Sequence, residues 1–114
     1  MKQLALVLAL VALPVAAAHA DPPAHVVNDA GASLSLDCGD GGQVVVNGAA
    51  NRIAITGGCA KVVINGSTNQ VAIDAADKIA ITGSRNTVTY KKGWTKKNPK
   101  VTRLGTGNTI AKLK

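Results

Sequence analysis

Two aspartate pairs are the side chains of this sequence that most resemble catalytic machinery. Asp37 and Asp40 lie three residues apart, and so do Asp74 and Asp77. Glycoside hydrolysis requires a pair of carboxyl groups that flank the bond to be cleaved. Both pairs, however, lie in segments where aspartate is better explained as a turn former. We therefore expect no catalytic residue and no enzymatic activity.

The residue types present also argue against a metal site and against nucleophilic catalysis. The two cysteines and His25 are too few and too widely spaced for a tetrahedral metal site, and no Ser-His-Asp set is possible beyond one that would use the terminal His25. Calcium-binding nonapeptide solenoids need aspartate in their turns, whereas the corresponding turns here read NGAAN, NGSTN and TGSRN. We predict no metal and no cofactor.

The segment YKKGWTKKNPKV, residues 90–101, contains five lysines and the only tryptophan of the chain. An aromatic ring among cations can attach to phosphate-bearing polymers or to membrane surfaces. The alternative is that Trp94 packs across the open side of the domain while the lysines are merely solvated. The candidate anion-binding residues are Lys91, Lys92, Trp94, Lys96, Lys97, Lys100 and Arg103.

An internal repeat determines where these residues must lie. Four segments superpose, beginning at Val44, Val62, Ile79 and Val101, so their starts are 18, 17 and 22 residues apart. A weaker copy begins at His25. The longest interval accommodates a basic loop insertion at residues 91–100. Each of the four segments has glycine at its fifth position and asparagine at its eighth: Gly48, Gly66, Gly83 and Gly105, and Asn51, Asn69, Asn86 and Asn108.

Apolar residues alternate within two short runs of each repeat, which is typical of strands with one buried face. If each repeat is one turn of a solenoid, equivalent residues stack about 4.8 Å apart, so asparagines form ladders and glycines recur where the chain turns. We predict a small right-handed parallel β-solenoid with two short strands per coil and about five coils. The alternative is an antiparallel β-sandwich or barrel. Arg103 and Lys112, at inward positions of the last coil, are expected to close the core and block further stacking.

The combination of these features resembles a known family. A secretion signal, one cysteine before GGQVVVNG, a second cysteine in ITGGCAKVVING and the repeated G-x-x-N-x-V-x-I pattern are similar to the bacterial secreted family DUF3060. The likeness covers about Cys38 to Ile110. It implies a small exported β-repeat domain with no assigned activity and no catalytic residue that could be carried over.

A disulfide between Cys38 and Cys59 is expected from the repeat and from export. Residues 1–20 have an early cation, a short apolar core and a small-x-small ending, which predicts a cleaved signal peptide and a mature domain of residues 21–114. We expect a periplasmic or secreted protein without a transmembrane segment after cleavage. Oxidising surroundings favour a bridge, and adjacent coils bring the two cysteines within the reach of one.

Charge is distributed unevenly along the mature chain. Residues 21–77 contain six aspartates and two cations, whereas residues 78–114 contain ten cations and no acid. Such asymmetry favours an anionic partner, either an envelope polymer or lipid head groups, without specific nucleic-acid recognition. The alternative is a purely structural or protein-interaction module, which a contiguous outward patch of Val45, Val63, Ala54 and Ala72 would favour. We expect a monomer.

Overall fold

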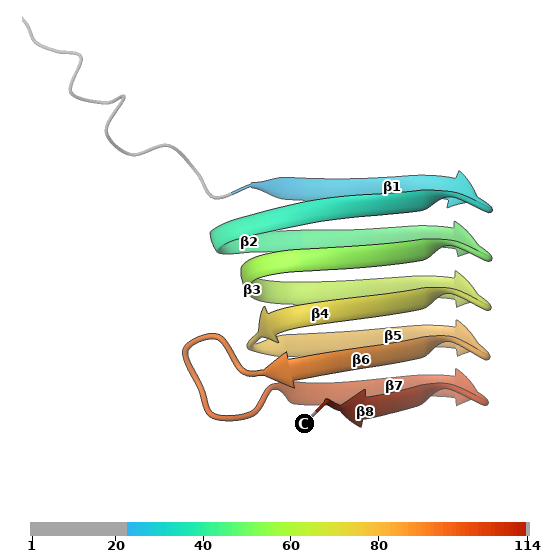
Figure 1. Cartoon of the computed structure of the whole chain (residues 1–114). Helices are drawn as coiled ribbons and strands as arrows, with labels where there is room; N and C mark the ends of the chain where they lie inside the picture. Colours follow the sequence, from blue (N-terminus) through green and yellow to red (C-terminus); the bar gives the residue numbers. More distant parts are fainter. Residues whose placement is uncertain (1–22, 114) are drawn as a thin grey trace, which may run out of the picture.

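The computed structural model describes residues 23–113 of the chain as an all-β domain. The predicted signal peptide, residues 1–20, lies outside the described residues. Eight strands follow one another, connected by tight turns except for one longer loop (Figure 1). They are β1 (Ala24–Ala30), β2 (Ser33–Ala49), β3 (Arg52–Ser67), β4 (Gln70–Ala76), β5 (Lys78–Ser84), β6 (Thr87–Lys92), β7 (Lys100–Thr106) and β8 (Thr109–Lys112).

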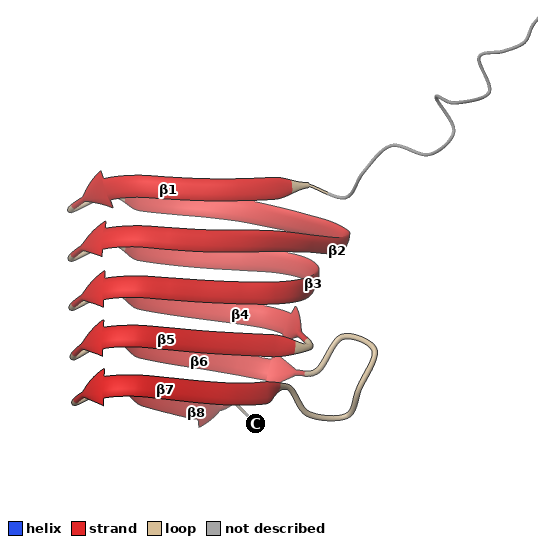
Figure 2. Cartoon of the chain, turned by 180° about the vertical axis from the view of Figure 1, so that it is seen from behind, coloured by secondary structure: helices blue, strands red, loops and turns tan. Residues whose placement is uncertain are grey.

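All strand pairs are parallel, and each joins residues about one repeat apart. The chain therefore winds as a β-solenoid of about five coils, as predicted. One face, the first sheet, contains β1, β5, β7 and the C-terminal parts of β2 and β3. The opposite face, the second sheet, contains β4, β6, β8 and the N-terminal parts of β2 and β3. In both Figure 1 and Figure 2 the nearer strands run leftward as the chain descends, so the winding is right-handed.

The core lies between the two sheets and consists of stacked β-branched side chains. Val44, Val62 and Ile79 form one inward column of the first sheet, and their side chains are buried. Ile53 and Val71 occupy the corresponding column of the second sheet. Alternation with period two follows directly from the pleat of a strand, which sends successive side chains to opposite faces. No Phe is available, so the regular repeat substitutes for large aromatic side chains.

The recurring glycines are required by the close approach of successive coils. Gly48, Gly66, Gly83 and Gly105 all have φ between +105° and +144°. A Cβ added at Gly66 would overlap the carbonyl oxygen of Gly48, and a Cβ at Gly83 would overlap that of Gly66. Glycine alone meets both demands without strain. These contacts explain why glycine recurs at this position, one residue before the end of β2, β3, β5 and β7.

The recurring asparagines form a buried ladder beside the glycines. Asn51, Asn69 and Asn86 are at most 1% exposed. The backbone N–H of Asn51 donates to Oδ1 of Asn69 at 3.1 Å, and the backbone N–H of Asn69 donates to Oδ1 of Asn86 at 3.0 Å. The amide Nδ2 of each donates to a carbonyl oxygen of the preceding coil, as from Asn69 to Gly48. The ladder therefore satisfies turn backbone groups that would otherwise be buried without partners.

Two boundaries differ from the sequence expectation. The basic insertion is shorter than residues 91–100, because Lys91 and Lys92 belong to β6 and Lys100 begins β7. The loop itself spans residues 93–99, and it leaves the solenoid at one corner (Figure 1).

In the last coil Arg103 and Lys112 pair in register with Ile81 and Tyr90 of the coil above, and both are exposed.

Candidate functional site

The corner where the second sheet turns into the first contains most of the unusual features of the domain. The turns between coils have different lengths there, and the β2–β3 pairing shifts register between Asp37 and Gln43. A disulfide joins Cys38 and Cys59 across two of these turns, with a Cα–Cα distance of 5.2 Å. The predicted bridge is thus present, and both cysteines are fully buried.

Trp94 folds back over this corner from the loop. The five-membered ring of its indole lies over Gly58, and its six-membered ring lies against Gly41. An added Cβ at Gly58 would overlap Cδ1 and Nε1 of the indole, although the backbone of Gly58 is not in the left-handed region. Glycine at this position therefore makes room for the ring. Trp94 remains 37% exposed, so the indole is seated on the corner but still accessible.

Replacing Gly58 by alanine is expected to lift the indole from the corner. The new Cβ cannot occupy the space of the ring, so the displacement should shift the emission of the single tryptophan to longer wavelength. Stability should fall by about 1–2 kcal/mol, because part of the buried indole returns to water. Tryptophan fluorescence and urea unfolding measure the two effects.

The matched control is the same substitution in a Trp94→Ala background. Without the ring, Gly58→Ala should leave stability nearly unchanged, so a double-mutant cycle isolates the contact. Equal destabilisation in both backgrounds would show that Gly58 is required for another reason.

Asp77 fixes the loop that carries Trp94. Its Oδ1 accepts backbone N–H donors from Trp94 at 3.0 Å, Thr95 at 2.8 Å and Lys96 at 3.2 Å, and its Oδ2 accepts the hydroxyl of Thr95. The Thr95 hydroxyl is the largest cause that holds the pKa of Asp77 below its ordinary value; burial opposes it, and the backbone donors add to it. Asp77 is therefore a turn residue, as expected, and it anchors the basic loop, whereas Asp74, which was also expected in a turn, lies within β4.

Acidification is expected to release the loop. Because the pKa of Asp77 is lowered in the folded protein, the ionised carboxylate makes its full contribution to stability above the unfolded pKa of 3.8. This contribution is lost as the pH falls through the pKa of the folded state. Trp94 emission should therefore shift below pH 3.8, before the whole domain unfolds. Asp77→Ala should show the released signal at neutral pH.

Asp77→Asn provides the control, since it keeps an acceptor oxygen but cannot titrate. Its Trp94 emission should be independent of pH in the same acid range. An identical acid transition in this variant would assign the transition to another group.

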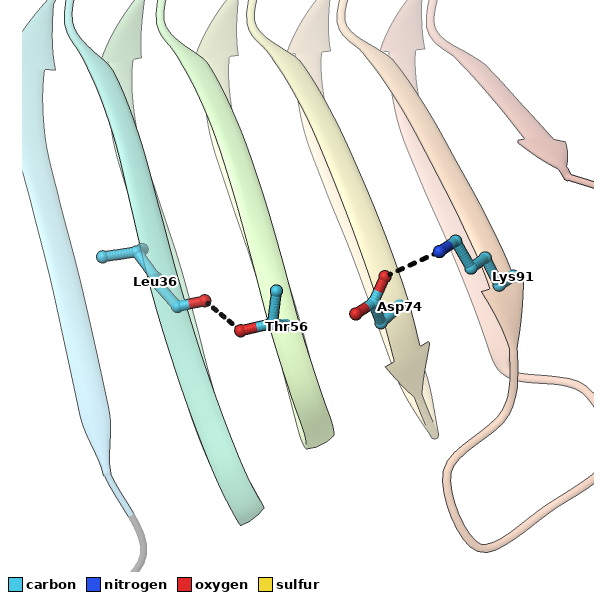
Figure 3. A network of polar contacts seen from close by, with 4 residues as sticks. All are labelled: Leu36, Thr56, Asp74 and Lys91. Atoms are coloured by element: carbon cyan, nitrogen blue, oxygen red, sulfur yellow. Dashed lines mark hydrogen bonds and ion pairs between the residues drawn. The ribbon is translucent and has the colours of Figure 1, made fainter.

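The predicted anion-binding residues do not form one cluster. Lys91 lies on the outer face of the second sheet and pairs with Asp74, with Nζ and Oδ1 3.4 Å apart. Figure 3 shows this pair beside the bond between the Thr56 hydroxyl and the carbonyl oxygen of Leu36. Lys92 and Trp94 line one small pocket. Lys96 and Lys97 are exposed on the loop, and Arg103 lies on the last coil.

A column of lysines on the first sheet was missed by the sequence analysis. Lys78 pairs in register with Lys100, and Lys61 directly precedes Val62, which pairs with Ile79, the residue after Lys78. All three are exposed and alternate with inward residues, so their side chains share the outer face. The signal was available: each lysine directly precedes the first apolar residue of its repeat. We call Lys61, Lys78 and Lys100 the lysine column.

A pocket of about 290 Å³ opens beside the indole. It is lined by Gly57, Gly58, Asp74, Ala75, Lys92 and Trp94. Its lining residues thus include an aromatic residue, an aspartate, a lysine and two glycines. We call it the corner pocket. The pocket lies where the second sheet ends, since Lys92 is the last residue of β6. The lysine column lies on the first sheet, where Lys100 begins β7.

The proposed apolar patch is not contiguous. Val45 and Val63 stack on the outer face of the first sheet, whereas Ala54 and Ala72 stack on that of the second. The small residues of the second sheet instead form the floor of a shallow hollow of about 710 Å³. Nothing in that hollow resembles a catalytic constellation.

Among residues 23–113 no group of three or more His, Cys, Asp or Glu side chains is placed to hold a metal ion. The same range contains no helix with the length and hydropathy needed to cross a membrane.

A family model described as a protein of unknown function, DUF3060, matches residues 46–110. No curated protein and no solved structure is significantly similar to the chain. The matched residues cover more than half of the sequence and include the glycine column, the buried asparagine ladder, the lysine column and Trp94. The chain belongs to the DUF3060 family of proteins of unknown function.

Proposed function

We propose that the protein is an exported, non-catalytic binding module that attaches to anionic polymers of the cell envelope through its basic corner, by which we mean the lysine column together with Lys96 and Lys97 of the loop. The lysine column is the observation that carries this proposal. Its three lysines occupy equivalent register positions of successive coils on one outer face, and neighbouring coils are about 4.8 Å apart. Like charges at such positions repel one another. A linear polyanion that runs along the column would relieve this repulsion.

The lysines of the column make no ion pair with the described residues 23–113. Among residues 23–113, the ion pair is that of Lys91 with Asp74, which lies on the other sheet. Asp77 is adjacent to Lys78 in sequence, but its carboxylate is occupied by the loop backbone. The column is therefore available to an external anion.

The charge gradient supports an orientation for binding. Asp29, Asp37 and Asp40 lie in the first coil and the turn after it, whereas the cations concentrate on the last coils and the loop. The resulting field attracts a polyanion to the C-terminal end of the stack and repels it from the N-terminal end. Arg103, Lys96 and Lys97 extend this basic end beyond the column.

The test is salt-dependent retention of the mature domain on immobilised polyphosphate and polygalacturonate. Wild-type protein should bind at about 50 mM salt, where screening is weak. The variant Lys61→Gln/Lys78→Gln should bind more weakly to both, with the slope of log affinity against log salt reduced by roughly one per lysine. Arg52→Gln/Arg85→Gln, which removes the same net charge elsewhere, is the control.

Equal losses in the two double variants would mean that only total charge matters and would overturn the role of the column. Absence of retention by wild-type protein on either polymer at about 50 mM salt would overturn the proposed function altogether. A structural or protein-interaction module would then be the remaining candidate.

A further inference from the structure

We infer that the corner pocket receives a sugar ring, so that the ligand of the basic corner is an acidic polysaccharide. This inference rests on the proposed function, because it specifies which polyanion the lysines attract. It comes from the position of Trp94, whose ring is both fixed and partly exposed.

The indole is fixed before any ligand arrives. Gly41 and Gly58 receive its two rings, and Asp77 binds three consecutive backbone N–H groups of the loop, beginning with Trp94 itself. Lys112 adds a second anchor through its Nζ, which lies 3.2 Å from Oδ1 of Asn98. A ring that is already ordered loses little conformational entropy when a ligand packs against it.

A fixed indole favours a polymer over a membrane. Insertion into a bilayer would require Trp94 to leave both glycines and would expose the corner that it covers. Stacking requires no such movement, because 37% of the residue is already accessible. The electron-rich face of an indole attracts the polarised C–H groups of a sugar ring, as it attracts the positive edges of other rings.

The polar groups of the pocket complement a sugar ring that carries an acidic group. Asp74 can accept hydrogen bonds from ring hydroxyls while it remains paired with Lys91. Lys92 supplies an ammonium group for a carboxylate on the same ring. Gly57 and Gly58 line the pocket, and Gly58 leaves room for the indole that forms one of its walls. A pocket of about 290 Å³ is of a size for one sugar unit and not for a long segment.

The pocket and the lysine column can act on one chain of polymer. Both flank the corner that the loop crosses between Lys92 and Lys100. The column attracts any polyanion, and its effect decreases with salt. The pocket adds contacts that depend on the ring and persist when charges are screened. The two contributions are therefore separable by experiment.

The experiment titrates the mature domain with oligogalacturonate at about 1 M salt, where the Debye length is about 3 Å, and follows Trp94 emission. Wild-type protein should show a saturable emission change with oligogalacturonate and none with polyphosphate of equal charge. Trp94→Ala, followed by calorimetry, should lose about tenfold or more in affinity. Lys92→Gln should weaken binding, whereas Arg52→Gln, an equal charge change outside both the pocket and the lysine column, should not.

Circular dichroism and thermal unfolding establish that each variant is folded. Lys92→Gln retains the indole, so it still tests the pocket if Trp94→Ala loosens the loop. Wild-type affinity for oligogalacturonate in both variants would overturn the sugar site. The proposed function would survive that result if the lysine-column variant still lost polyanion binding at low salt. Emission changes with phosphatidylglycerol vesicles and none with oligogalacturonate would also overturn the inference and assign the corner to lipid head groups.

Discussion

Replacing Asn69 by alanine is expected to destabilise the domain by about 3 kcal/mol. Asn69 is fully buried, its Oδ1 accepts the backbone N–H of Asn51, and its Nδ2 donates to the carbonyl of Gly48. Alanine would leave that donor and that acceptor without partners, and an unsatisfied buried group costs about 1–3 kcal/mol. In a domain of this size the melting temperature should fall by roughly 15 °C.

Asn65→Ala is the matched control for this prediction. Asn65 belongs to a second, outer ladder in which its Nδ2 donates to Oδ1 of Asn47 at 3.0 Å. Its side chain is partly exposed, so water can replace the lost bond, and the cost should stay below about 1 kcal/mol. Thermal unfolding of the two variants decides the matter. Equal losses would mean that the buried ladder contributes no more than surface amides do.

Removing the disulfide by Cys38→Ala/Cys59→Ala is expected to lower the free energy of unfolding by about as much as Asn69→Ala does. The two residues are 21 apart in sequence, and the loop-entropy relation gives about 3 kcal/mol for a closed loop of that length. The bridge also joins two turns whose backbone departs from the regular pairing of β2 with β3. Its loss should therefore loosen the seat of Trp94 as well as the fold.

Denaturant unfolding with and without reductant measures this effect. The midpoint of the wild-type protein should fall when reductant is present, whereas the double alanine variant should not respond. Because both cysteines are fully buried, reduction should require unfolding and should be slow under native conditions. Wild-type and variant midpoints that coincide without reductant would contradict the prediction.

The two stabilising systems serve different parts of the molecule. The asparagine ladder lies at the turns from the first sheet to the second, and the disulfide lies at the opposite corner. Only the second corner carries the loop, Asp77 and Trp94. Variation of the loop can therefore alter the corner pocket without disturbing the buried ladder, which is the arrangement expected of a binding site on a rigid scaffold.

The repeat in the sequence determined the columns of the fold. Gly48, Gly66 and Gly83, and likewise Asn51 and Asn69, could be aligned before any coordinates existed, because a solenoid converts equal sequence spacing into neighbouring positions in space. The same argument placed Cys38 close to Cys59. The lysine column follows the same rule, because Lys61, Lys78 and Lys100 each directly precede the first apolar residue of a repeat.

Only the tertiary structure decided what happens at the corner. Trp94 and Asp77 have no counterparts in the other repeats, so periodicity says nothing about where their side chains go. The seat of the indole on Gly41 and Gly58 and the capture of the loop by a buried carboxylate depend on turns of unequal length that meet across several coils. The repeat determines which residues lie beside a periodic residue. The neighbours of a residue in a single insertion depend instead on how the insertion packs against the whole stack.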